Sequence, residues 1–401
     1  MFMSTPDKRS LSIIILVVIL IIGVTYGISF FARGYQISTK GKLSFLATGI
    51  ISATSRPKAA SVYINDRLIT ATDDTINLVP DEYTIKIVKD GYLPWQKTIQ
   101  IKKELVYQTD TQLFRSAPDL KPVTLTGAIN PAGSPDGSLV VFSVASASAT
   151  KDNGLYLLEL SNNVNFLAKN IARQLSSNLS NLDWSKFTFT FSPNSRQILA
   201  KNISNNTNYL INLDVTTDYK NLYDVTPKLT LIKEEWQNQE EELIKAKLTL
   251  VPKEIQAIAS TTSAKNILFS DDDTKILYLA KADADLQKDL ITPPPAQSTQ
   301  NQSRDIKKDN YYVYDIKDDT NFWIGNSSLE NLNWLTNSYN LIYTEDQKIQ
   351  TIEYDNTNKL TLFAGNFNKN VVYPWLDGSK IITLTAPYSN AQENLYSISI
   401  R

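Results

Sequence analysis

The chain has 401 residues, with no cysteine, no histidine, and 40 basic against 41 acidic side chains. These absences exclude disulfides, histidine-based catalytic triads and zinc sites built from Cys and His. The balanced charge provides no field that would attract nucleic acid, so we expect no nucleic-acid partner. The 20 tyrosines, with many Asn, Thr and Ser residues in the second half, favour a mainly β protein of two or three domains.

Residues 11–31 form a continuous uncharged stretch, LSIIILVVILIIGVTYGISFF. A helix of this length spans about 30 Å, the thickness of the hydrocarbon core of a membrane. We predict a retained single-pass transmembrane helix, with residues 1–10 as a tail and residues 32–42 as a linker. A cleaved signal peptide is the weaker alternative, because Gly27-Ile28-Ser29 matches a cleavage site poorly.

The charges beside this stretch do not decide its orientation. Lys8 and Arg9 precede it, whereas Arg33, Lys40 and Lys42 follow it. A short tail before the helix and a large domain after it favour a cytoplasmic tail and an extracytoplasmic bulk, which would place the protein in the cell membrane. An inverted protein, with a cytoplasmic scaffold, stays open.

Residues 43–115 alternate short apolar runs with turns. Asn65-Asp66 and Asp90-Gly91 supply two of the turns. Three groups of alternating apolar residues mark strands: Val62 and Ile64; Tyr83, Ile85 and Ile87; and Trp95, Ile99 and Ile101. The pattern predicts a compact β-sandwich-like module, followed by a linker at 116–127.

This module resembles the PEGA domain, a small β module of bacterial surface and envelope proteins. The resemblance rests on GIISATSRPKAASVYI from Gly49, LVPDEYTI from Leu78 and KDGY from Lys89. The P-E-G-A signature reads Pro57-Lys58-Ala59-Ala60 here, and Asn65-Asp66 and Pro80-Asp81 occupy turns where the family usually has glycine. The resemblance implies an extracytoplasmic structural or adhesive module without catalytic residues.

A similar phrase recurs five times within residues 128–401. The copies are GSPDGSLVVFSV from Gly133, FSPNSRQILAKN from Phe191, FSDDDTKILYLA from Phe269, WLTNSYNLIYTE from Trp334 and WLDGSKIITLTA from Trp375. Each has an aromatic residue, or glycine in the first copy, then a polar turn and an apolar strand. Because one such unit cannot bury both faces of its sheet, the repeat predicts a C-terminal β-propeller of about six blades, five of them readable. LSNLDWSKFTFT from Leu179, or strands before Gly133, could supply the sixth.

The repeated phrase resembles that of TolB-like and WD40-like propellers, which implies an architecture but no single function. Two insertions interrupt it. Residues 232–260 predict a short helical insertion with Trp236, Leu243 and Ile244 on one face. Residues 282–309 are polar and proline-rich, which predicts a flexible loop with a solvated basic run at 304–308.

We predict no catalytic, cofactor-binding or metal-binding residue. Asp271-Asp272-Asp273 lacks the ligand spacing of a calcium loop and occupies a blade turn. Ser134-Pro135-Asp136-Gly137 differs from a sialidase Asp box, because Asp and Gly are adjacent. The aromatics Tyr311, Tyr312, Tyr314 and Trp323 could form a sugar-stacking platform, but their strand spacing favours core packing.

The sequence therefore favours a non-enzymatic, membrane-anchored envelope or cell-surface protein. Its propeller would bind a protein, a peptide or a cell-surface glycan, without a cofactor. The alternative from another class is a carboxylate-dependent hydrolase of envelope polysaccharide, which would need a pair of desolvated Asp or Glu residues. The oligomeric state stays open.

Overall fold

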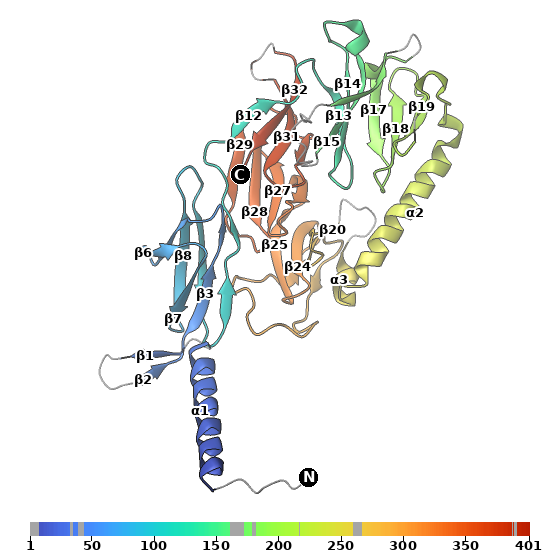
Figure 1. The fold of residues 1–401 in the computed structure, drawn as a ribbon. Helices are drawn as coiled ribbons and strands as arrows, with labels where there is room; N and C mark the ends of the chain where they lie inside the picture. Colours follow the sequence, from blue (N-terminus) through green and yellow to red (C-terminus); the bar gives the residue numbers. More distant parts are fainter. Residues whose placement is uncertain are drawn as a thin grey trace, which may run out of the picture. The chain divides into compact units, whose positions relative to one another are not determined.

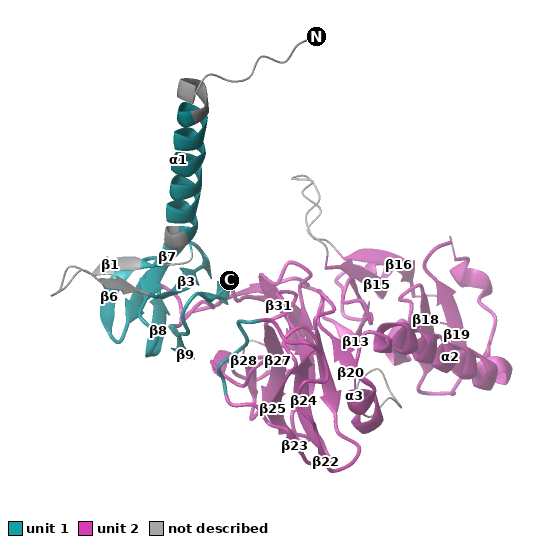
Figure 2. Cartoon of the chain, turned by 90° about the horizontal axis from the view of Figure 1, so that it is seen from below, with its two compact units in different colours: residues 1–90, 94–113, 295–300 teal, residues 91–93, 114–294, 301–401 magenta. Residues whose placement is uncertain are grey.

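The computed structural model describes residues 8–32, 35–38, 44–160, 172–178, 182–215, 217–259, 267–386, 388 and 391–401. Most of the predicted tail lies outside these residues, as do Arg33, Lys40 and Lys42. The chain forms two compact units (Figure 2). Unit 1 comprises residues 1–90, 94–113 and 295–300, and unit 2 comprises residues 91–93, 114–294 and 301–401.

The predicted apolar helix is α1 (Lys8–Ala32). Its window Ser12–Ser29 has a mean hydropathy of 2.6, and none of it is buried against the rest of the protein. The helix is thus long and apolar enough to cross a membrane. A short hairpin of β1 (Gln36–Ser38) and β2 (Ser44–Leu46) follows it.

The remainder of unit 1 is a module of small β-sheets. The first has the order β6 (Arg67–Ala71), β5 (Ser61–Ile64), β8 (Glu82–Val88) and β9 (Trp95–Gln100). The second has the order β10 (Val106–Gln108), β3 (Gly49–Ala53) and β7 (Asp74–Leu78), and β11 (Thr111–Gln112) pairs with β4 (Ser55–Arg56). β10 and β11 run parallel to their partners, so the chain returns along the strands with which the module began.

The core of this module contains the alternating residues that the sequence marks. Val62, Ile85 and Ile87 are fully buried, and Trp95 is 3% exposed. The predicted turn between β5 and β6 has both central residues at positive φ, 47° for Asn65 and 61° for Asp66. Asn and Asp tolerate this conformation better than other side chains, which explains how this hairpin turn forms without glycine.

Residues 295–300 of the predicted loop belong to unit 1. The Gln300 side chain donates a hydrogen bond to the Thr98 carbonyl oxygen at 2.7 Å, and the Gln100 backbone N–H donates to the Thr299 hydroxyl at 3.3 Å. Both contacts lie on β9, an outer strand of its sheet. Polar side chains therefore satisfy part of an otherwise open sheet edge. The flexibility of the remaining loop stays a prediction.

The PEGA-like signature carries an alanine in an unfavourable backbone conformation. Ala59 has a φ of 56°, which costs an L-residue about 1–2 kcal/mol. Ala59→Gly removes this cost but also raises the conformational entropy of the unfolded chain, which offsets part of the gain. We predict that the change stabilises unit 1 by a net of about 1 kcal/mol. Slower hydrogen exchange of the β5 and β8 amides would show this. Ala60→Gly is the control: Ala60 is fully buried at negative φ, so this change should speed exchange.

Five sheets of unit 2 are numbered here as blades in chain order (Figure 1), and a further two-stranded sheet pairs β22 (Ala284–Asp285) with β23 (Asp305–Ile306). Blade 1 is β13 (Ile129–Gly133), β14 (Leu139–Val144), β15 (Gly154–Glu159) and β16 (Arg173–Ser177); blade 2 is β17 (Phe187–Phe191), β18 (Gln197–Asn202) and β19 (Asn208–Asn212). Blade 3 is β20 (Ile267–Phe269), β21 (Lys275–Leu279), β24 (Asn310–Asp315) and β25 (Thr320–Asn326); blade 4 is β26 (Glu330–Trp334), β27 (Asn340–Glu345), β28 (Lys348–Glu353) and β29 (Leu360–Ala364).

Blade 5 joins the two ends of the propeller. Its strands are β30 (Val372–Pro374), β31 (Lys380–Thr385), β32 (Asn394–Ser399) and β12 (Asp119–Pro122). β12 comes from the beginning of unit 2, yet it pairs antiparallel with β32, opposing Asp119 to Ser399. Residues 119–122 of the predicted linker are thus a strand, and this strand and the last strand of the repeat region hold the ring together by backbone hydrogen bonds.

A hydrogen bond from the backbone to a side chain fixes each repeated polar turn. In each blade, an Asp or Asn side chain accepts a hydrogen bond from the backbone N–H two residues later. These residues are Asp136, Asn194, Asp272, Asn337 and Asp377. Such Asx turns fix the reversal between the first two strands of a blade, which explains why Asp or Asn recurs at this position.

Neighbouring blades pack through apolar clusters. These clusters join blade 5 to 1, 1 to 2, 3 to 4 and 4 to 5. The missing aromatic at the start of the first repeat also has an explanation. The ring of Tyr373, from β30, lies where a side chain of Gly133 would extend, 2.8 Å from a built Cβ position. An aromatic from the neighbouring blade therefore fills the place of the absent one.

Blade 2 and blade 3 are bridged by helices. α2 (Leu229–Leu248) contacts blade 2 through Trp236, whose indole N–H donates to the Gln197 side chain at 3.4 Å. Lys247, about 16 Å further along the helix, forms a 2.6 Å ion pair with Asp273 in the blade 3 turn. α3 (Lys253–Ile258) packs Ile255 into the blade 3 core. The predicted helical insertion is confirmed, and these helices lie between blades 2 and 3 (Figure 1).

One detail of the predicted helix is wrong. Trp236 is buried and Ile244 packs against the blade 3 core, but Leu243 is 54% exposed. The helix contacts first one blade and then another, so its buried side turns along its length. The buried residues of α2 therefore do not form the single apolar stripe that is typical of a helix lying on one surface.

Gly133→Ala should weaken the contact between blades 5 and 1, because the added methyl would overlap the Tyr373 ring. We expect a loss of about 1–3 kcal/mol in the free energy of unfolding, measured by denaturant titration. Tyr373→Leu removes the ring from the contact and should recover part of this loss in the double variant. Strictly additive effects of the two changes would contradict the contact.

Candidate functional site

A pocket of about 400 Å³ opens where the first strands of blades 5, 1 and 2 begin. This volume lies within the range of small-ligand and peptide side-chain sites. The lining residues are Ala128, Ile129, Asn130, Pro131, Ala132, Thr188, Phe189, Asn368, Asn370, Val371, Leu384 and Glu393. The pocket lies at the ends of these strands away from the Asx turns.

An irregularity in β13 shapes the wall of the pocket. The register between β13 and β14 shifts between Ile129 and Ala132, and Asn130 has a φ of 49°. The Asn130 side-chain NH₂ donates to the Phe187 carbonyl oxygen of blade 2 at 2.9 Å. In blade 4, Asn331 has the same positive φ and donates to the Lys369 carbonyl oxygen next to blade 5. Both asparagines stand three residues before the repeated phrase, so their spacing is a signal for the bulge that the sequence carries.

Several polar groups of the lining have no partner within the described part of the chain. Asn130 Oδ1 accepts no hydrogen bond, and the Thr188 hydroxyl makes none. Asn368 uses Oδ1 to accept the Asn370 backbone N–H at 3.0 Å, which leaves its NH₂ available. Beneath these groups, Ala128, Phe189, Val371 and Leu384 are buried. Unpaired polar groups around an apolar floor suit the binding of an amphipathic ligand.

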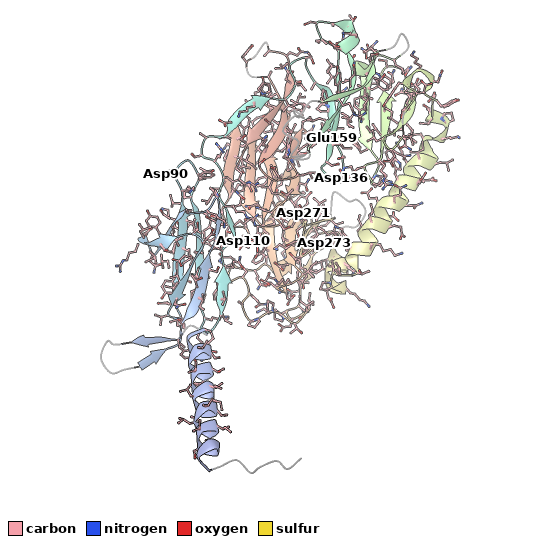
Figure 3. The ribbon with its side chains drawn as sticks, viewed as in Figure 1. Asp90, Asp110, Asp136, Glu159, Asp271 and Asp273 are labelled. Atoms are coloured by element: carbon pink, nitrogen blue, oxygen red, sulfur yellow. The ribbon has the colours of Figure 1, made fainter. Side chains whose placement is uncertain are left out.

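The pocket lining contains one carboxylate, that of Glu393. Glycosidases of the common kinds need two carboxyl groups that face each other across the scissile bond. Other acidic side chains of unit 2, including Asp136, Asp271 and Asp273, lie at turns outside the pocket (Figure 3). The geometry of the pocket therefore favours binding over this hydrolysis.

The acidic residues that were weighed as candidates and set aside in the sequence belong to the turns of the blades. Asp272 accepts hydrogen bonds from Ser270 and Thr274, and Asp273 pairs with Lys247. Asp136 accepts from Ser134 and Ser138. Burial alone would raise the pKa of Asp136, but these hydrogen bonds hold its pKa below the usual value. In the described residues, no group of three or more acidic side chains is placed to hold a metal ion.

The aromatic and basic candidates also divide between core and surface. Tyr312 and Tyr314 are buried in the blade 3 core, whereas Trp323 is 42% exposed. They therefore do not form one stacking platform. The prediction of a solvated basic run is wrong for Arg304, whose side chain is 14% exposed and pairs with buried Asp319 at 3.4 Å. Lys307, in contrast, is exposed.

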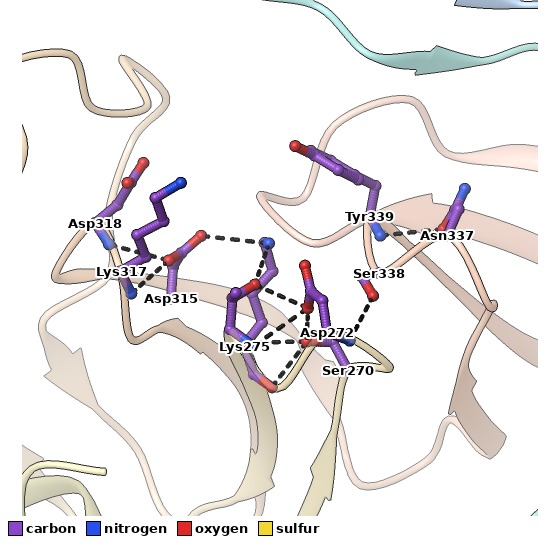
Figure 4. Close-up of polar contacts among 10 residues, drawn as sticks. Ser270, Asp272, Lys275, Asp315, Lys317, Asp318, Asn337, Ser338 and Tyr339 are labelled. Atoms are coloured by element: carbon purple, nitrogen blue, oxygen red, sulfur yellow. Dashed lines mark hydrogen bonds and ion pairs between the residues drawn. The ribbon is translucent and has the colours of Figure 1, made fainter. Parts of the chain in front are cut away.

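A buried ion pair joins two neighbouring strands of blade 3, β21 and β24 (Figure 4). Lys275 Nζ lies 3.6 Å from an Asp315 carboxylate oxygen, and both side chains are at most 6% exposed. The ammonium also lies 4.9 Å and 4.8 Å from the ring centroids of Tyr339 and Tyr354. Burial raises the pKa of Asp315, which outweighs the opposing attraction of Lys275. The two charged residues belong to blade 3, whereas the two tyrosines flank strands of blade 4, so the ammonium links the two blades through its ring contacts.

Family comparison identifies the module in unit 1. Residues 48–116 match the PEGA domain family. The match covers the β3–β11 strands and the turn at Ala59, as the sequence resemblance predicted. The PEGA domain therefore follows the apolar helix and precedes the repeat region.

Solved structures that resemble the chain include TolB proteins. A structure described as TolB from Agrobacterium tumefaciens is 11% identical, with a TM-score of 0.22, and the match covers 68% of this chain and 78% of that one. TolB from Acinetobacter baumannii is 10% identical, with a TM-score of 0.20 and coverage of 80% and 60%. Dihydro-heme d1 dehydrogenase NirN, in complex with DHE, is 13% identical, with a TM-score of 0.19 and coverage of 65% and 42%. No curated protein matches the sequence. The assignment of a β-propeller rests instead on the five blades and on the pairing of β12 with β32.

Lys275→Met should destabilise unit 2 by about 3 kcal/mol at neutral pH, because it leaves the buried Asp315 carboxylate without its positively charged partner. The loss should shrink as the pH falls, since an acid whose pKa is raised in the folded state costs stability only when ionised. Denaturant titrations at several pH values measure this. Asp315→Asn should restore stability in the double variant, and a loss independent of pH would contradict the assignment.

Proposed function

We propose that this protein is a membrane-anchored envelope protein whose propeller lies outside the cytoplasm and binds a protein, peptide or glycan partner. The pocket at blades 5, 1 and 2 carries the proposal. Its polar groups are unpaired in the described structure, and its floor is apolar. Function in propellers resides in such sites, because the architecture itself serves many activities.

The anchor supports the proposed location. α1 is apolar and unburied along its Ser12–Ser29 window, and it precedes a PEGA domain. A cytoplasmic tail ahead of α1 then places both β units on the outer side. Retention of the helix, rather than cleavage, keeps the propeller at the membrane surface.

Binding fits the pocket better than the hydrolase alternative. Hydrolysis of a polysaccharide would use one carboxyl group as an acid and a second as a base or nucleophile. Glu393 has no second carboxyl group beside it in the lining. A binding role needs complementary shape and hydrogen bonding alone.

A photo-crosslinking amino acid at Asn370 tests both parts of the proposal. In intact cells we expect a covalent adduct, identified by mass spectrometry, that an external protease removes. Thr188→Trp should reduce the adduct at least fivefold by filling the pocket. Thr190→Trp is the matched control, because Thr190 is exposed on the same strand but does not line the pocket.

Two results would contradict the proposal. An adduct that resists external protease until lysis would place the propeller in the cytoplasm. An adduct equally strong in the two tryptophan variants, or none at all, would show that the pocket does not bind the partner.

A further inference from the structure

We infer that the pocket binds a peptide segment carrying a basic side chain, lysine or arginine. The inference rests on the proposed function and specifies its ligand. Three properties of the lining support it: its single charge, its amide groups and its apolar floor.

Glu393 supplies the only charged side chain among the lining residues. It precedes β32, is exposed, and forms no ion pair or side-chain hydrogen bond with the described residues. Lys369 lies in sequence between the lining residues Asn368 and Asn370. Its side chain is paired with Glu330 at 3.7 Å and does not line the pocket. The only charge within the lining is thus negative and complements a cation; Lys201, exposed opposite Thr188, lies outside the lining.

Three asparagines provide both donors and acceptors. Asn130 offers Oδ1, since its NH₂ is held by Phe187 O, and Asn368 offers its NH₂, since its Oδ1 is held by the Asn370 N–H. The Asn370 side chain is unpaired in the described structure and offers both groups. A peptide backbone presents one N–H and one C=O per residue, so it can pair with this mixed set.

The apolar floor suits the stem of a long basic side chain. Ala128, Val371 and Leu384 are aliphatic and buried. Lysine and arginine place their methylene groups on such surfaces while the charged end reaches a polar rim.

The test uses four mixtures of fluorescent hexapeptides, with one fixed central residue, Lys, Arg, Gln or Glu, and random flanks. Binding to the purified full-length protein in detergent is followed by fluorescence polarisation. We expect the Lys and Arg mixtures to bind at least tenfold more tightly than the Gln mixture, and the Glu mixture to bind most weakly. Added salt should reduce the difference.

Glu393→Gln should abolish the preference for Lys and Arg while leaving binding of the Gln mixture within twofold. Glu159→Gln, at the end of β15 and outside the pocket, should leave the preference intact. Equal binding of all four mixtures, or a preference that survives Glu393→Gln, would overturn the inference. If no mixture binds while the Thr188-sensitive adduct at Asn370 still forms, the peptide inference fails and the proposed function stands.

Discussion

The structure of unit 2 depends on one constraint: each face of a blade stays out of water only while a neighbouring element covers it. The described apolar clusters show this in four places, each combining residues from two consecutive blades. A blade therefore has little stability alone, and the ring must be closed. Pairing of β12 with β32 contributes to this closure, since it makes one sheet from the segment before the repeat region and the end of that region.

The same constraint accounts for the helices between blades 2 and 3. β17 alternates phenylalanines, which pack towards blade 1, with exposed Thr188 and Thr190, and Lys201 opposite Thr188 is also exposed. This face of blade 2 combines these polar residues with Leu199, which is 7% exposed, and α2 contacts blade 2 through Trp236. Blade 3 has an apolar face at the same junction, and α3 with the end of α2 covers it. The helices thus cover an apolar face that another blade would otherwise have to cover.

The sequence predicts the parts of this architecture that depend on local patterns. The uncharged span of α1, the strand alternation around Ile85 and the recurring Asx turn all follow from short-range chemistry. It does not predict the exposure of Leu243 or the burial of Arg304, because both depend on which distant element lies opposite. The pocket cannot be predicted from local patterns for the same reason, because its lining residues come from separate segments, among them those of Asn130, Thr188, Asn370 and Glu393. Only the spacing of Asn130 and Asn331 before the repeat gives a local hint.

The position of the pocket follows from how the blades are fixed. At one end of each blade, an Asx turn holds the first two strands in register, and bonds such as Asp136 N–H to Ser195 Oγ join neighbouring turns. Substitutions there would disturb the repeat itself. The opposite ends are connected by variable segments, so side chains can differ from blade to blade without changing the sheets. A bulge at Asn130 and an acidic residue at Glu393 can therefore arise at this end, where the pocket of the proposed function lies.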